Sequence, residues 1–193
     1  MNSKNLDENY YHHQNSRSGM MLDSNELPSY YDKLNVNITP QFYFLDIGCR
    51  AHTNAVNFFY QKGAQSYGFD IGKEADKVWQ VTRPVYLENL KVHDAHEEFK
   101  YTFQFDLISI SHTLEHCHTP TKVLYNIWNA LKVGGKVWGI VPVEKVTDDH
   151  APHYCNFHSH QEHIKIYEQA GFEIVWDIES KNNSYIIAKK ATK

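Results

Sequence analysis

Three residues in the first half of the chain, Asp46, Gly48 and Asp70, have types and a spacing that suit the binding of a nucleoside. A glycine in a turn lets a ligand approach the backbone closely. A carboxylate only accepts hydrogen bonds, so Asp70 can accept one from each hydroxyl of a ribose. Asp70 follows Gly48 by about 20 residues, the separation expected in a nucleotide-binding βαβ unit. These residues therefore predict a nucleoside site.

The segments around these residues are typical of such a βαβ unit. Residues 42–47 are mostly apolar, residues 55–59 carry apolar side chains at helical spacing, and residues 67–69 are apolar again. Strand, helix and strand in this order predict a parallel sheet, whose buried strands are apolar on both faces. Arg50 and His52 occupy the positions where a dinucleotide site has its later glycines, so a nicotinamide oxidoreductase is the least favoured function.

A second block continues the pattern further along the chain. Residues 105–111 form the clearest strand, rich in large apolar side chains. Thr119 and Pro120 suit the cap and the first position of a helix, and Gly134 with Gly135 suits its end. The next predicted strand covers residues 136–142.

Together the two blocks resemble class I S-adenosylmethionine-dependent methyltransferases, and the second block resembles the type 11 group. The motifs that carry the resemblance are Asp46-x-Gly48, Phe105-Asp106-Leu107, Ser111-His112-x-Leu114-Glu115-His116 and Leu131-Lys132-x-Gly134-Gly135. The resemblance implies a three-layer α/β/α sandwich with a seven-stranded, mostly parallel sheet in the order 3-2-1-4-5-7-6. The sheet is expected to end in an antiparallel hairpin, because residues 172–178 and 185–188 are joined by a short connection.

The resemblance also implies S-adenosylmethionine as cofactor and S-adenosylhomocysteine as product. The cofactor-binding residues that we predict are Asp46, Gly48, Cys49, Arg50, Asp70, Ile71, Asp94, Ala95 and Ser111. Asp94 follows a predicted third strand at residues 90–93, where the family has an acid that accepts a hydrogen bond from the adenine amino group. The alternative is that Asp94 caps a helix, since Glu97 and Glu98 suit a first helical turn.

Two histidines are candidate catalytic bases. An imidazole with a pKa near 6.5 can deprotonate an oxygen or nitrogen acceptor at neutral pH. His112 lies at a strand end, and His153 lies in the long polar loop of residues 143–157. Type 11 relatives often carry a histidine followed four positions later by an aromatic residue, as His153 and Phe157 are here. The alternative for His153 is that it only fixes the loop by bonding a carbonyl.

The acceptor is expected to be a small molecule. No Asn/Asp-Pro-Pro-aromatic motif follows Ile110, which argues against methylation of a nucleobase amino group by that arrangement. The rival function is a methyltransferase fold without catalysis, acting as a cofactor-binding partner or regulatory subunit. Arg50 and His52 in the turn, and the short chain, motivate this rival.

The 13 histidines of the chain raise the question of a metal site. Cys155, His158, His160 and His163 are of types that bind zinc, but their spacing is not that of a standard zinc finger. Ser159 and Glu162 form a capping box, so we expect His160 and His163 to be exposed in a first helical turn. His112 with Glu115 and His116 is a second possible group, and we expect Glu115 and His116 to bond nearby backbone donors and acceptors instead. We therefore predict no metal.

Composition bounds the remaining possibilities. The chain has 193 residues and a net charge of −4, which gives no general signal for nucleic acid. Three scattered cysteines favour a reducing compartment, and no apolar run could span a membrane, so we expect a cytoplasmic protein. We divide the chain into residues 1–40, a leader that either packs on the domain or forms a lid, and residues 41–193, the methyltransferase-like domain.

Overall fold

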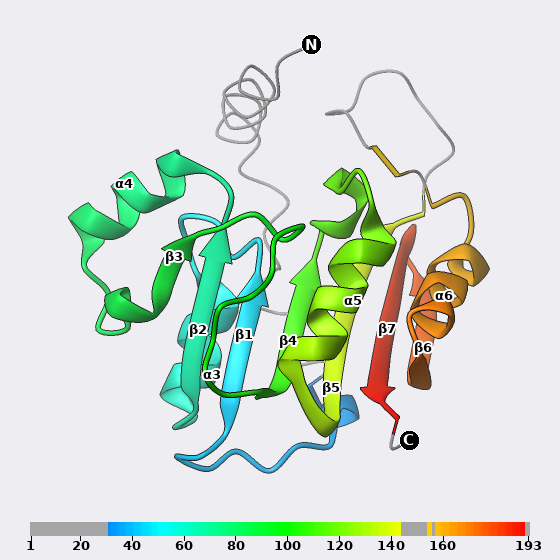
Figure 1. The fold of residues 1–193 in the computed structure, drawn as a ribbon, viewed down its shortest axis with the longest axis horizontal. Coiled ribbons are helices and arrows are strands. Elements are labelled where there is room, and N and C mark those ends of the chain that lie inside the picture. The colour runs from blue at the N-terminus through cyan, green and yellow to red at the C-terminus, as the bar shows by residue number, and fades with distance from the viewer. Residues whose placement is uncertain (1–30, 144–153, 156, 192–193) are drawn as a thin grey trace.

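The computed structural model describes residues 31–143, 154, 155 and 157–191. Within these ranges, seven strands form one sheet in the order β3-β2-β1-β4-β5-β7-β6 (Figure 1). The strands are β1 Tyr43–Ile47, β2 Gln65–Asp70, β3 Leu90–Val92, β4 Phe105–Ser111, β5 Leu131–Pro142, β6 Phe172–Ser180 and β7 Asn183–Lys190. The helices are α3 Asn54–Gln61, α4 Lys73–Thr82, α5 Pro120–Ala130 and α6 His160–Gln169, with 3₁₀ turns η1 Leu87–Asn89 and η2 Leu114–His116. The predicted fold class and strand order are confirmed.

Helices on both faces of the sheet make the three layers, and the alternation of side chains along each strand explains why. Phe44 and Leu107 pack with Phe59 of α3 in one apolar cluster. Their chain neighbours Leu45 and Ile108 point to the opposite face and pack with α5 and α6 in a second cluster. The central strands β1 and β4 are therefore apolar on both faces, as a parallel sheet requires.

The last two strands form the predicted antiparallel hairpin. Lys181 and Asn182 connect them with φ angles of 50° and 63°. Two central residues with positive φ make a type I′ turn, whose twist matches that of the paired strands. Since β7 also runs antiparallel to β5, the turn places Asn183 beside Pro142, at the carboxyl end of β5.

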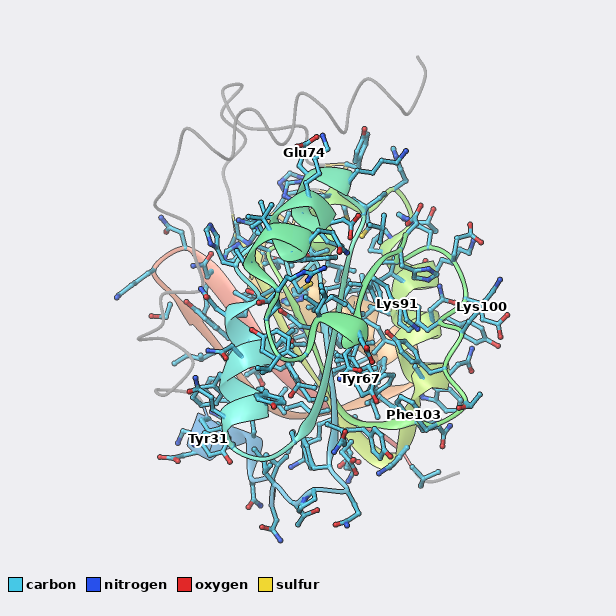
Figure 2. All side chains as sticks on the ribbon, turned by 90° about the vertical axis from the view of Figure 1, so that its left-hand side faces the viewer. Tyr31, Tyr67, Glu74, Lys91, Lys100 and Phe103 are labelled. Atoms are coloured by element: carbon cyan, nitrogen blue, oxygen red, sulfur yellow. The ribbon has the colours of Figure 1, made fainter. Side chains whose placement is uncertain are left out.

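The connection from β3 to β4 is not helical, so the alternative that Asp94 caps a helix is wrong. Residues 93–104 contain no helix or strand. Aromatic side chains cover the sheet there instead, and Figure 2 shows Tyr67 beside Phe103, with ring centroids 5.1 Å apart. Asp94 accepts a hydrogen bond from the backbone N–H of His96, which makes an Asx turn rather than a helix start.

The start of the described chain packs on the domain. Residues 31–34 are helical, Leu34 is fully buried, and Lys136 on β5 donates to the Leu34 carbonyl at 2.5 Å. Residues 31–34 of the predicted leader therefore contact the domain, and the division of the chain at residue 40 stays a prediction. Residues 1–30 lie outside the described ranges, so the lid stays a prediction. No helix among the described residues is both long enough and apolar enough to cross a membrane.

Candidate functional site

A pocket lies at the carboxyl ends of β1 and β4, where the turn after β1 meets the first turn of α3. It is lined by Asp46, Gly48, Cys49, Arg50, His52, Thr53, Asn54, Ala55, Ser111 and His112. The structure thus brings together six of the residues predicted from the sequence for the cofactor or for catalysis. Sequence reasoning missed His52, Thr53, Asn54 and Ala55 as lining residues. The signal was present, because the start of a helix following a strand offers free N–H groups.

The turn between β1 and α3 has positive φ angles, which favour glycine, at Gly48, Arg50 and Thr53, and only the first of these is a glycine. Gly48 has a φ of 73°, and a Cβ there would lie 2.2 Å from Thr113 Oγ1, so no side chain fits. Arg50 has a φ of 53°, which is strained for a residue with a side chain. Its backbone is held from two directions, because its N–H donates to Asp70 and its carbonyl accepts from Trp79 Nε1 at 3.0 Å.

Asp70 lies at the end of β2, as predicted, and both of its oxygens are used by the protein. Oδ2 accepts from the Arg50 N–H at 2.9 Å, and Oδ1 accepts from the Gly72 N–H at 2.8 Å. Each carboxylate oxygen has two lone pairs and can accept more than one hydrogen bond. The next residue, Ile71, is 47% exposed and offers an apolar surface beside this carboxylate.

Asp46 is almost completely buried beneath the turn. Ser109 Oγ on β4 donates to Asp46 Oδ1 at 2.5 Å. Burial raises the pKa of Asp46 to about 7, and the nearby Asp70 charge adds to the rise, while the Ser109 bond and Arg50 oppose it. The Asp46 carboxyl group therefore changes from the protonated to the ionised form near neutral pH.

His112 follows β4 on the other side of the pocket with a φ of 47°. Its Nδ1 lies 3.6 Å from Oε1 of the buried Glu115, and His116 Nε2 lies 3.9 Å from the same oxygen. Burial raises the pKa of Glu115, but the two imidazoles outweigh burial and lower it overall. The Glu115 carboxylate takes a backbone hydrogen bond from its own residue, as expected, and it also lies between the two imidazoles.

Asp94 and Ala95 follow β3, the neighbour of β2 at the edge of the sheet. The His93 N–H donates to the Asp70 carbonyl at 2.9 Å, which keeps the two strand ends together. The Asp94 side chain is 41% exposed, and Ala95 is buried. The predicted adenine-binding residues thus lie at the same carboxyl edge of the sheet as Asp70.

A family model described as a methyltransferase domain matches residues 21–176. The chain belongs to this methyltransferase domain family. The predicted class I resemblance is therefore confirmed, while the narrower type 11 grouping stays a prediction. No curated protein sequence matches the chain significantly.

Solved structures share the fold of this methyltransferase domain at low sequence identity. A SAM-dependent methyltransferase from Aquifex aeolicus has a TM-score of 0.66 at 19% identity, with 88% of this chain and 90% of that chain covered. Phosphoethanolamine N-methyltransferase 2 of Haemonchus contortus, solved with S-adenosyl-L-methionine, has a TM-score of 0.68 at 17% identity, with 87% and 53% covered. The [4+2]-cyclase SpnF has a TM-score of 0.65 at 16% identity, with 79% and 76% covered.

The histidines at the start of α6 are placed differently from the prediction. His163 is fully buried, and His160 is partly buried, so the expectation that both are exposed is wrong. The Nδ1 atoms of both rings are within hydrogen-bonding distance of Ser184 Oγ, at 2.6 Å for His160 and 2.8 Å for His163. The other ring nitrogen of His160, Nε2, lies 2.7 Å from Asp177 Oδ1. Ser159 caps the helix as predicted, while the Glu162 carboxylate accepts from the N–H of His158 instead of that of Ser159, and the hairpin of β6 and β7 covers this helical turn.

Two further predictions concern this carboxyl edge of the methyltransferase domain. His153 lies outside the described residues, so its position is not tested. Among the residues that the structure describes, no group of three or more histidine, cysteine or acidic side chains could hold a metal ion.

Proposed function

We propose that this methyltransferase domain transfers a methyl group from S-adenosylmethionine to a small-molecule acceptor in the cytoplasm. The observation that carries the proposal is the pocket at the ends of β1 and β4, whose turn is hydrogen-bonded to Asp70. Bound S-adenosylmethionine supplies a methyl group that its sulfonium already activates. The protein then needs to hold the acceptor in line and exclude water.

The residues of the pocket, together with those at or just after the ends of β2 and β3, fit the parts of such a cofactor. Gly48 forms the turn that borders the pocket, and Asp70 accepts from the ribose hydroxyls. Ile71 packs against the adenine ring, whose amino group donates to Asp94. Asp46, ionised above neutral pH, attracts the ammonium group at the other end of the molecule.

Proton removal from the acceptor falls to a histidine. His112 lines the pocket beside the buried Glu115, which stabilises the imidazolium that forms when His112 accepts a proton. His153 is the second candidate, as base or as a group that orients the acceptor. The assignment of His112 rests on residue type and on its place in the pocket, and that of His153 rests on residue type and on its place in the sequence after β5.

A second candidate function is cofactor binding without transfer. It is favoured by Arg50 and His52, two bulky residues that line the pocket in the turn where the family motif has glycine. The chain also shares its fold with a protein named as a cyclase, and a fold by itself does not determine the activity.

The test begins with calorimetric titration of S-adenosylmethionine and S-adenosylhomocysteine into the full chain. The wild type should bind both compounds, and an Asp70→Ala variant should bind them more weakly. Formation of S-adenosylhomocysteine is then measured with a panel of small hydroxyl, amine and carboxylate acceptors. Binding with turnover supports the transferase, and binding without turnover on any acceptor supports the second candidate. Absence of binding contradicts both.

A further inference from the structure

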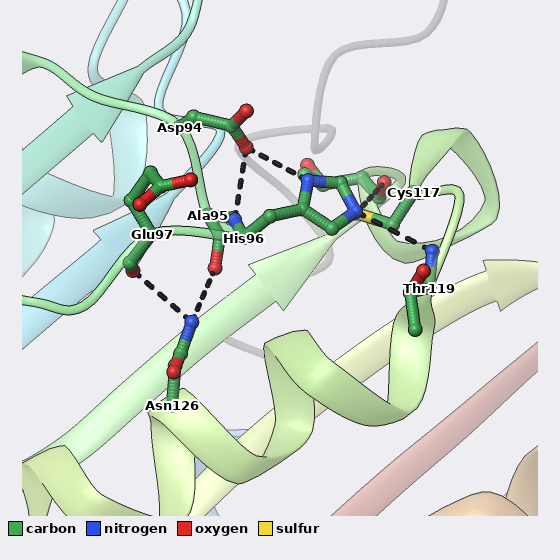
Figure 3. A network of polar contacts seen from close by, with 8 residues as sticks. Asp94, Ala95, His96, Glu97, Cys117, Thr119 and Asn126 are labelled. Atoms are coloured by element: carbon green, nitrogen blue, oxygen red, sulfur yellow. Dashed lines mark hydrogen bonds and ion pairs between the residues drawn. The ribbon is translucent and has the colours of Figure 1, made fainter.

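The loop after β3 is attached to α5 by two side chains (Figure 3). His96 Nδ1 lies 2.8 Å from Asp94 Oδ1, and its Nε2 lies 3.4 Å from the backbone nitrogen of Thr119, just before α5. Asn126 on α5 donates to the carbonyls of Ala95 and Glu97, both at 3.0 Å. These bonds hold the position of the loop relative to the helix that follows β4.

The bonds of His96 determine which ring nitrogen carries the proton. A backbone N–H can only donate, so Nε2 accepts from Thr119 and has no hydrogen of its own. The proton therefore lies on Nδ1, which donates to Asp94 Oδ1. The His96 imidazole thus donates a hydrogen bond to Asp94 through Nδ1 and accepts one from the Thr119 N–H through Nε2.

Both bonds from His96 reach the same carboxylate oxygen. The backbone N–H of His96 donates to Asp94 Oδ1 at 2.9 Å, in addition to the ring nitrogen. No described residue donates to Oδ2, and the Asp94 side chain is 41% exposed. One oxygen is therefore fixed by the protein, and the other is available to a ligand.

The same contacts keep the carboxyl group ionised. Partial burial raises the pKa of Asp94, but the backbone and side-chain bonds from His96 outweigh burial and lower it. An ionised carboxylate accepts hydrogen bonds and does not donate them. It therefore distinguishes a ring that carries an amino donor from one that carries a carbonyl acceptor.

We propose that His96 is a positioning residue for base recognition, which fixes Asp94 so that its free oxygen accepts from the adenine amino group. The inference rests on the proposed function, in which Asp94 binds adenine. It adds a residue whose effect is on selectivity for the base. His96 acts through Asp94 and need not touch the cofactor.

The test compares two ligands that differ only at the base. S-adenosylhomocysteine carries the amino group, and its inosine counterpart carries a carbonyl in the same place. The dissociation constants of both are measured for the wild type and for His96→Ala, His96→Asn and His118→Ala. His118 is the matched control, because its ring lies 6.1 Å from that of His96 and makes no bond to Asp94.

We expect the wild type to prefer the adenine ligand. His96→Ala should weaken binding of that ligand about tenfold, the effect of losing one charged hydrogen bond, and should reduce the preference over the inosine ligand. His96→Asn should recover part of both effects, because its amide can donate from near the position of Nδ1. His118→Ala should match the wild type.

The outcomes separate this inference from the proposed function. If the wild type binds neither ligand, the proposed function fails. If the wild type prefers the adenine ligand and His96→Ala keeps that preference, the role of His96 is wrong. A loss of affinity for both ligands by the same factor, without recovery in His96→Asn, also overturns it, because that pattern marks a merely structural role. If His96→Ala does not fold, His96→Gln takes its place, since its amide lies near Nε2 and cannot replace the donor to Asp94.

Discussion

The backbone N–H of Arg50 donates to Asp70 Oδ2 at 2.9 Å, which joins the turn after β1 to the end of β2. The carboxylate predicted to bind the ribose therefore also holds the turn that forms the floor of the pocket. Substitutions at these two residues should have effects on both cofactor affinity and turn stability, and the two effects can be measured separately.

Replacing Asp70 should weaken cofactor binding. Asp70→Ala removes the acceptor for the ribose hydroxyls, and we expect a loss of about 2 kcal/mol in the binding of S-adenosylhomocysteine, as for hydrogen bonds to charged groups. Titration calorimetry measures the change, and thermal unfolding shows whether the turn is retained. Asp76→Ala is the control, an acid of α4 that bonds Gln80 on the surface. An unchanged dissociation constant in folded Asp70→Ala would exclude the ribose role.

Arg50→Gly should be tolerated or should improve cofactor affinity. The φ of 53° is free of strain for glycine, and the smaller residue opens the turn. Arg83→Gly is a matched control, because Arg83 has a φ of 45° at the end of α4 and does not line the pocket. Both variants should unfold at a similar or higher temperature than the wild type. A large loss of affinity confined to Arg50→Gly would mean that the Arg50 side chain binds the cofactor, for example its carboxylate.

Asp46 should make stability fall as pH rises towards 7. Its pKa is about 7 in the folded protein against 3.8 in the unfolded chain, so between these values the folded state holds a proton that the unfolded state has lost. The free energy of unfolding should therefore decrease through this window, by at most about 1.4 kcal/mol per pH unit from this group. Asp46→Asn should remove that component. Identical pH dependence in denaturant titrations of both proteins would contradict the prediction.

His163 should have the opposite effect at acid pH. Burial lowers its pKa to about 3 from 6.5, and the neighbouring His160 contributes. The unfolded state takes up a proton first as pH falls from about 6.5 to 3, so the folded state loses stability across that range. His163→Asn keeps a donor near Ser184 and should show a shallower loss in acid titrations followed by circular dichroism. His158→Asn, at an exposed position, should behave like the wild type.

His112→Asn should lower turnover while leaving cofactor affinity near that of the wild type. Asparagine tolerates the positive φ of this position but cannot act as a base. The loss expected for a general base is about a hundredfold or more in turnover on an oxygen or nitrogen acceptor. His153→Ala is measured in parallel with the same acceptor. The variant that keeps full turnover is not the base, and full turnover in both would assign proton removal to another group.

Local sequence patterns determined most of the fold. The apolar run of β4 fixed a buried strand, and its bounds are those predicted. Ser159 and Glu162 predicted the start of α6, because a capping box needs only residues within one turn. The strand order came from the resemblance to a family rather than from any single segment. The acid positions Asp70 and Asp94 followed from the same pattern, since ligands in such sheets bind at the carboxyl ends of strands.

The tertiary structure decided the backbone conformation, burial and hydrogen bonds that residues distant in the sequence impose on these local elements. Arg50 adopts a glycine-like conformation because Asp70 and Trp79, 20 and 29 positions away, bond its backbone. His163 is buried because the hairpin brings Ser184 onto its ring from 21 positions away. His96 connects Asp94 to Thr119 across the edge of the sheet. A sequence shows which residues can donate, accept or ionise, but burial and partners across the sheet determine the backbone conformation, the tautomer and the pKa that each adopts.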